Sequence, residues 1–330
     1  MKHLQVSTYK TNQNLPDKLK SLKEYDVPNN VVRLNEYCFA GCESLSRITI
    51  STTLESIEKY SFYNCTSLTS IILPETLTKI GKSCFENCIN LKVVSLPSSL
   101  LTIGSCAFKN CNNLTSIVIP KYIRKIGKST FEHCIRLSAI DLPMGIKYIS
   151  KLAFKECGQL STINIPESVR SLGERCFESC ANLLQITIPK NVSIIPESCF
   201  EKCYSLTLVK MFDNVKYIKS RAFNDCVKLS HVNLSKNLKL IEQKVFNHDI
   251  QITYNNADYI LDKHYFNEEQ QLISALNILP DTSKNDIQRL TTQLLIFYNF
   301  IDFDTFSIEF PALKNIKVEK QKGWDVWLFK

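Results

Sequence analysis

The stretch LTSIVIPKYIRKIGKSTFEHC, from Leu114 to Cys134, contains one copy of a recurring sequence pattern. Outward from it, the phenylalanine at Phe131 recurs every 23 residues in both directions, with no insertion or deletion across ten units, which we number 1 to 10. The recurring residues are Phe39, Phe62, Phe85, Phe108, Phe131, Phe154, Phe177, Phe200, Phe223 and Phe246. A fixed period of this length is the signature of a repeat architecture.

Other columns keep the same period. In units 1 to 9, Cys stands three residues and Leu six residues after each Phe, and Asp249 and Ile252 take these places in unit 10. Aliphatic residues stand nine and eleven positions after Phe and are usually followed by Pro. The pattern Leu-x-x-Ile-x-Ile predicts a short strand with one buried face, which the Pro ends. The run through Phe and Cys to Leu has apolar spacings of three to five and predicts a short helical or 3₁₀ turn on the opposite side.

A single unit cannot bury its own apolar residues, so the units are expected to stack into a repeat solenoid. Its strands would form a parallel sheet on the concave face, with neighbouring units about 4.8 Å apart. The column of Phe side chains would then run through the core.

The repeat closely resembles the BspA-like leucine-rich repeat, whose unit reads approximately L-x-x-I-x-I-P-x-x-V-x-x-I-G-x-x-A-F-x-x-C. The resemblance covers residues 27–252, about two thirds of the chain. The Gly of the pattern stands at positions 81, 104, 127 and 173, and Pro is lost at Ser51, Phe212 and Ser235, so the ends of the array are less regular. The resemblance implies a leucine-rich-repeat solenoid that binds a ligand or partner, often in adhesion or surface-antigen settings, and it implies no catalytic residues.

The period divides the chain into three parts. Residues 1–27 keep part of the pattern without a Phe and are expected to form a degenerate capping unit, followed by the solenoid at 28–252. Residues 253–330 leave the period, with helices expected over 267–279 and 283–297 and a strand near 313–318. This segment is expected to be a small α+β cap that shields the last unit. The alternative is a separate interaction module.

All 14 Cys belong to the repeat, nine of them in the column after Phe. Three roles compete: small buried hydrophobe, disulfide ladder between stacked units, and metal ligand. We favour the first, because the column lies among core positions and the four Cys-x-x-x-Cys pairs lack a His partner in the repeat. No metal site or cofactor is expected.

Two surfaces are candidates for partner binding. Residues eight and ten positions after Phe should point outward from the strands, and there Ile72, Val93, Val118 and Ala139 form a mostly apolar group in successive units. An exposed apolar patch can mark an interface. The alternative is that these residues are simply good strand formers.

The second surface is basic. Sixteen residues after Phe, successive units place Arg124, Lys147 and Arg170, and an acidic or phosphorylated partner could dock along this edge. Residues 1–246 carry 32 Lys and Arg against 20 Asp and Glu, a net charge of +12, whereas the remainder carries 8 against 12. The alternative is that these cations keep a long edge soluble. Nucleic acid is not expected, because no aromatic residues interleave the charges of that column.

These features predict a non-enzymatic scaffold for protein–protein interaction. There is no phosphate loop, nucleophile elbow or metal-binding pair of His residues. No apolar stretch is long enough to insert into a membrane, and the N-terminus lacks the apolar core of a signal peptide, so a cytoplasmic location is expected. The alternative, a cell-surface adhesin or antigen, follows from the family resemblance.

Overall fold

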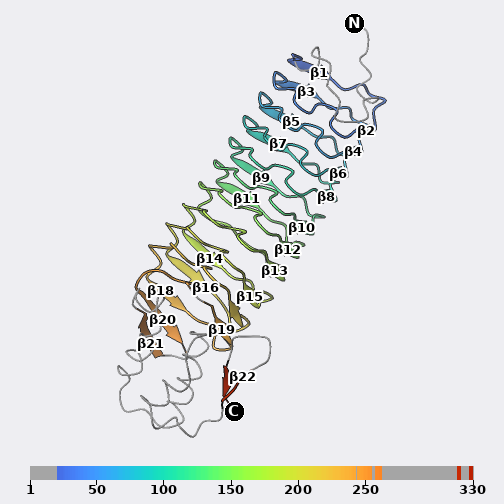
Figure 1. Cartoon of the computed structure of the whole chain (residues 1–330). Coiled ribbons are helices and arrows are strands. Elements are labelled where there is room, and N and C mark those ends of the chain that lie inside the picture. The colour runs from blue at the N-terminus through green and yellow to red at the C-terminus, as the bar shows by residue number, and fades with distance from the viewer. Residues whose placement is uncertain (1–20, 243, 255–256, 262–317, 321–326, 330) are drawn as a thin grey trace.

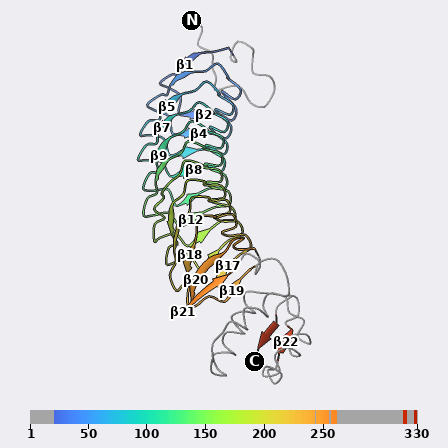
Figure 2. The same cartoon turned by 90° about the vertical axis from the view of Figure 1, so that its left-hand side faces the viewer.

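The computed structural model describes residues 21–242, 244–254, 257–261, 318–320 and 327–329. The repeat region forms an elongated solenoid in which every unit is one coil of the chain stacked on the next (Figures 1 and 2). Three-residue strands lie along one side of the stack and two-residue strands along the other (Figure 1). The predicted leucine-rich-repeat solenoid with parallel strands is therefore confirmed.

The three-residue strands follow the predicted Leu-x-x-Ile-x-Ile pattern. They are β1 (Glu24–Asp26), β3 (Arg47–Thr49), β5 (Ser70–Ile72), β7 (Val93–Ser95), β9 (Ser116–Val118), β11 (Ala139–Asp141), β14 (Gln185–Thr187), β16 (Leu208–Lys210) and β18 (His231–Asn233). Paired strands are parallel and offset by one period, as Ile71 opposite Val94 shows. In unit 6, residues 162–164 keep the exposed–buried–exposed alternation but are not paired as a strand.

The opposite side differs from the prediction. Where helical or 3₁₀ turns were expected, the described residues contain no helix, and each coil has a two-residue strand followed by turns. These strands are β2 (Arg33–Leu34), β4 (Ser56–Ile57), β6 (Lys79–Ile80), β8 (Thr102–Ile103), β10 (Lys125–Ile126), β12 (Tyr148–Ile149), β13 (Ser171–Leu172), β15 (Ile194–Ile195), β17 (Tyr217–Ile218) and β19 (Leu240–Ile241). They form parallel sheets ordered β2-β4-β6-β8, β10-β12-β13 and β15-β17-β19.

The turns around Phe exclude a helix because left-handed residues interrupt them. In every unit the residue two before Phe has a positive φ, and in units 1 to 9 so does the residue two after it, as in Leu152 and Glu156 around Phe154. Alternate backbone N–H groups then point in different directions. Those of Leu152, Phe154 and Glu156 donate to carbonyls of the next coil, whereas those of the intervening residues donate three residues back. The turns therefore stack by backbone hydrogen bonds, as the strands do.

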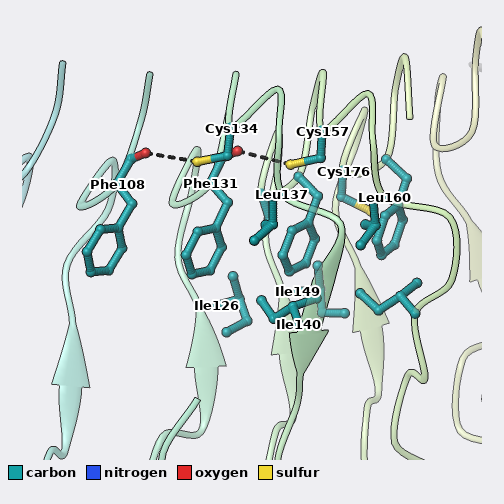
Figure 3. Close-up of a cluster of buried hydrophobic side chains, with 14 of the residues drawn as sticks. Phe108, Ile126, Phe131, Cys134, Leu137, Ile140, Ile149, Cys157, Leu160 and Cys176 are labelled. Carbon is teal, nitrogen blue, oxygen red and sulfur yellow. Dashed lines mark hydrogen bonds between the residues drawn. The ribbon is translucent and has the colours of Figure 1, made fainter. Parts of the chain in front are cut away.

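The ten Phe side chains form a continuous stack through the core. All are fully buried, and successive rings lie parallel within 9°, with centroids 5.2 to 5.7 Å apart. Figure 3 shows Phe108 and Phe131 in this stack, with Ile126, Ile140 and Ile149 packed beneath the rings. The predicted column of Phe side chains through the core is confirmed.

The Cys column forms hydrogen bonds between coils, in addition to its expected role as a small buried hydrophobe. In units 2 to 9 each thiol donates a hydrogen bond to the backbone carbonyl of the Phe one unit earlier, with sulfur–oxygen distances of 3.1 to 3.2 Å. Figure 3 shows two of these bonds, from Cys134 to Phe108 and from Cys157 to Phe131. Burial raises the pKa of the Cys38 and Cys42 thiols to about 12, so the thiols stay protonated at neutral pH.

None of the 14 Cys, all within the described residues, is in a disulfide. Cys176 and Cys199, one residue before Phe in neighbouring units, bring their sulfurs to 3.5 Å. Among the described residues, no group of three or more His, Cys, Asp or Glu side chains converges as metal ligands would.

The ends of the solenoid modify the repeat. At the N-terminal end, β1 pairs with β3 in the same 23-residue register, and the Tyr25 ring packs on Phe39 at 5.3 Å. The strand pairing therefore extends one unit beyond the first Phe, into the segment expected to be a degenerate capping unit.

At the C-terminal end, β20 (Ile250–Tyr254) pairs with β18 at an offset of 20 residues, so Ile252 stands opposite Val232. The assignment of Ile252 to the Leu column was therefore wrong, because three residues are missing from the preceding turn. Strand β21 (Ala257–Leu261) then pairs antiparallel with β20 and ends the parallel ladder. Beyond it, β22 (Val318–Lys320) and β23 (Trp327–Phe329) form an antiparallel pair, and the expected helices lie outside the described residues.

Candidate interaction surfaces

The first candidate surface is the long-strand face, which we define as the exposed side of the three-residue strands. From β3 onward each of these strands buries its middle residue and exposes the flanking ones, apart from a half-buried His231 in β18, whereas the middle residue of β1, Tyr25, is half-buried. The side chains of Ile72, Val93 and Val118 are 78%, 59% and 66% exposed, and Ala139 is exposed as well. All four therefore point outward, as their columns predict.

The strand register places these four residues in a zigzag over units 2 to 5. Ile72 and Val93 lie on the paired strands β5 and β7, offset by two residues, and Val118 and Ala139 are related in the same way on β9 and β11. Residues at such diagonal positions lie about 7–8 Å apart and can contact a common ligand. The sequence did not single out Leu208, which is 53% exposed on β16, although it stands in the same column as Val93.

The second candidate surface is the basic edge beside the two-residue strands. Arg124, Lys147 and Arg170 stand on successive rungs, because the Lys147 N–H donates to the Arg124 carbonyl at 2.8 Å and the Arg170 N–H donates to the Lys147 carbonyl at 2.9 Å. Both Arg side chains are exposed and Lys147 is half-buried. The structure thus brings the three predicted cations together beside the β10-β12-β13 sheet.

Gly145 makes room for the Arg124 side chain. In units 2, 3 and 6 the residue at this position is Thr76, Ser99 or Ser168, whose hydroxyl donates to a carbonyl of the preceding coil. In unit 5 there is no side chain, and the Arg124 guanidinium occupies the place where a Cβ of Gly145 would stand. Arg124 is therefore packed against the next coil. The sequence pattern alone gave no sign of this arrangement.

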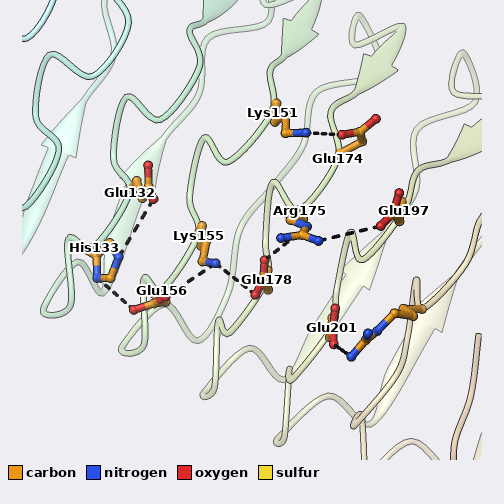
Figure 4. Close-up of polar contacts among 11 residues, drawn as sticks. Glu132, His133, Lys151, Lys155, Glu156, Glu174, Arg175, Glu178, Glu197 and Glu201 are labelled. Atoms are coloured by element: carbon orange, nitrogen blue, oxygen red, sulfur yellow. Dashed lines mark hydrogen bonds and ion pairs between the residues drawn. The ribbon is translucent and has the colours of Figure 1, made fainter.

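Charged residues on the turn side alternate in sign. The residues directly after Phe in units 3 to 7 are Glu86, Lys109, Glu132, Lys155 and Glu178, which we call the ion-pair ladder. Lys109 approaches Glu132 at 3.1 Å, and Lys155 approaches Glu178 at 3.1 Å. Figure 4 shows the second of these pairs within a network of contacts between successive coils. The ladder compensates the carboxylates of Glu132 and Glu178, which are less than 10% exposed.

The basic edge has no such compensation. Within the part of the chain that the structure describes, no carboxylate lies within 4.0 Å of the side-chain nitrogens of Arg124, Lys147 or Arg170. The same holds for the neighbouring Lys125 and Lys128. Lys151, one coil further on, does pair with Glu174.

Exposed aromatic and apolar side chains flank these cations, which sequence reasoning missed. Tyr148 stands directly opposite Lys125 in the β10-β12 pair, and its side chain is 47% exposed. Tyr122 and Met144 are 46% and 72% exposed in the preceding turns. The basic column itself contains no aromatic residue. The register of the two-residue strands, which places Tyr148 opposite Lys125, is the signal that identifies Tyr148.

Among the described residues, no helix is long and apolar enough to span a membrane.

Comparison with known proteins agrees with this architecture. The model of the BspA-type leucine-rich repeat region matches residues 13–138 and 124–253 in six copies. A leucine-rich repeat protein from Bacteroides ovatus is 26% identical with a TM-score of 0.54, over 71% of this chain and 74% of that protein. A leucine-rich cell surface protein from Faecalibacterium prausnitzii is 21% identical with a TM-score of 0.49, over 68% of this chain and 79% of that protein. No curated protein matches the chain in sequence.

The family model covers well over half of the chain, and its span includes all ten buried Phe rings. The chain therefore belongs to the BspA-type leucine-rich-repeat family.

Proposed function

We propose that the chain is a non-enzymatic scaffold that binds a partner protein, with the long-strand face as its main contact surface. The observation that carries the proposal is the zigzag of Ile72, Val93, Val118 and Ala139 across four successive coils. Exposed apolar side chains gathered on one face are typical of protein interfaces. The basic edge serves as a second contact surface for an acidic or phosphorylated region of a partner.

Substitutions on the long-strand face test this proposal. In the triple variant Ile72→Lys, Val93→Lys and Val118→Lys, partner capture from source cells should be lost, because three charges would have to be desolvated at the interface. The fold should survive, because these side chains are 59% to 78% exposed. Thr162→Lys, Gln185→Lys and Thr187→Lys provide a matched control at equivalent columns of later units. Retained capture by the first variant, or equal loss by the control, would exclude this surface.

A second candidate function is that of a cell-surface adhesin or antigen, which is supported by membership in the BspA-type family. Labelling living source cells with a membrane-impermeant amine reagent distinguishes the two locations. The cytoplasmic scaffold predicts an unlabelled chain alongside a labelled surface protein. A labelled chain would instead favour the adhesin, and its ligands would then be sought outside the cell.

A further inference from the structure

The basic edge stacks three like charges that have no carboxylate partner among the described residues. In the ion-pair ladder, by contrast, Lys109 and Lys155 each pair with a glutamate. The like charges of Glu178 and Glu201, in adjacent coils, are also each paired with a cation. Arg124, Lys147 and Arg170 occupy successive rungs about 4.8 Å apart with the same sign. Like charges directly opposite each other destabilise a sheet.

Three adjacent coils carry these like charges, and Lys216 and Lys239 return to the same column only in units 8 and 9. The column that holds Arg124, Lys147 and Arg170 contains Leu101 in unit 3 and Ser193 in unit 7. The three cations therefore span two steps, or about 10 Å, beside the single β10-β12-β13 sheet. A bounded group of this kind fits a short ligand segment better than a long charged polymer.

The surroundings of the charges suit a polypeptide. Tyr148 lies beside Lys125, and the exposed Tyr122 and Met144 lie in the turns that precede the cations. Tyr, Met and Arg are enriched in protein–protein interfaces. The place that Gly145 leaves for the Arg124 guanidinium holds this cation against the next coil before any partner arrives, which lowers the entropy lost on binding.

We propose that this basic patch, formed by Arg124, Lys125, Lys147 and Arg170 with Tyr148 and Met144, binds an extended acidic segment of a partner polypeptide. The inference rests on the proposed scaffold function and assigns a partner chemistry to its second surface. In an extended segment, alternate side chains lie about 6.7 Å apart on one face. Three alternating carboxylates span about 13 Å, which flexible Arg and Lys side chains on a 10 Å stack can reach. Apolar side chains that flank the acidic stretch would contact Tyr148 and Met144.

A synthetic probe tests the patch without knowledge of the natural partner. The probe is a fluorescein-labelled decapeptide of alternating Glu and Leu, and its reference replaces every Glu with Gln. Fluorescence anisotropy at about 0.1 M salt, where charges beyond about 10 Å are screened, should show binding of the Glu peptide at least tenfold tighter than that of the Gln peptide. Equal affinities would overturn the proposal.

Two triple variants locate the binding. Arg124→Ser, Lys147→Ser and Arg170→Ser introduce the residue that Ser193 already places in this column, so the coil should tolerate them. They should weaken peptide binding at least tenfold, whereas Lys92→Ser, Arg136→Ser and Lys228→Ser remove the same net charge outside this column and should change it less than threefold. Equal weakening would show that only net charge matters and would contradict a defined site. Circular dichroism melts establish that both variants fold.

A single substitution tests the placement of Arg124. Gly145→Ser puts a side chain where the guanidinium lies and offers the hydroxyl that other units use between coils. The variant should have the same melting temperature as the parent chain or a higher one, and it should bind the Glu peptide severalfold more weakly. Unchanged affinity would overturn the role of Gly145 in preparing the patch.

Other ligand classes provide the final comparison. A single-stranded oligonucleotide, or a vesicle of phosphatidylserine and phosphatidylcholine, that bound as tightly as the Glu peptide and lost binding in the Arg124, Lys147 and Arg170 variant would reject a polypeptide ligand. The Ile72, Val93 and Val118 lysine variant should still bind the Glu peptide. Failure of the long-strand face and failure of the basic patch are therefore distinguishable.

Discussion

At the residue scale, Phe and Cys side chains connect neighbouring coils in two different ways. Each Phe ring stacks on the next, and each thiol in units 2 to 9 satisfies the carbonyl of the Phe before it. The Phe stack could be predicted from the 23-residue period alone. The thiol hydrogen bonds could not, because a Cys at a buried position is equally compatible with simple packing.

Truncation in the middle of the stack should be costly. Phe154 lies between Phe131 and Phe177, with ring centroids at 5.5 and 5.4 Å, and is fully buried. Phe154→Ala should lower the free energy of unfolding by about 3–5 kcal/mol, through lost burial and the cavity left behind. Urea denaturation of the variant and the parent chain measures this. A loss below about 1 kcal/mol would show that the stack is not the main source of cohesion.

The buried thiols should make the fold sensitive to alkaline pH. Burial raises the pKa of Cys157 well above the ordinary thiol value of 9.0, so the folded state keeps its proton where the unfolded chain loses it. The stabilisation is present below pH 9 and falls as pH rises above it, by up to about 1.4 kcal/mol per pH unit for each thiol.

Unfolding free energies at pH 8, 9.5 and 10.5 test this effect. Cys157→Ala should be less stable than the parent at pH 8 but should lose stability less steeply above pH 9, because one titrating thiol is gone. Parallel pH profiles for the two chains would show that Cys157 does not contribute to the alkaline loss.

At the element scale, the turn side shows where sequence reasoning failed. Apolar spacings of three to five around Phe predicted a helical turn, yet left-handed residues, two in each of units 1 to 9 and one in unit 10, prevent a helix. Few side chains favour a positive φ, and the positions include Leu152 and Arg175, which give no warning of it. Asn64, Asn87 and Asn110, two residues after Phe, are the exception. Asn tolerates this backbone, and these amides also bond between coils.

The left-handed positions predict a stabilising substitution. Lys202, two residues after Phe200, has a φ of 61°, and Lys202→Asn should raise the free energy of unfolding by about 0.5 kcal/mol, because Asn adopts this conformation at lower cost. Lys228→Asn makes the same change at a turn residue without a positive φ and should not stabilise. Chemical denaturation compares the two variants, and equal effects would argue against conformational strain at Lys202.

At the scale of the whole molecule, the constant 23-residue period was enough to predict the architecture and the directions in which the strand side chains point. Departures from the period were harder to foresee. Ile252 continues the sequence count but changes column, because the turn after Phe246 is three residues shorter. Similarly, the packing of Arg124 against Gly145 and of Tyr148 beside Lys125 depends on contacts between coils, which a single unit does not reveal.

Site-specific photo-crosslinking tests most directly whether the long-strand face is the binding surface. A photoreactive amino acid would replace Val93 in one chain and Arg33, on the two-residue strand β2 and four coils away from the basic patch, in another. Irradiation in source cells should give a discrete covalent adduct with one partner from position 93 and none from position 33. Adducts from position 33 alone, or the same adducts from both positions, would contradict binding through the long-strand face.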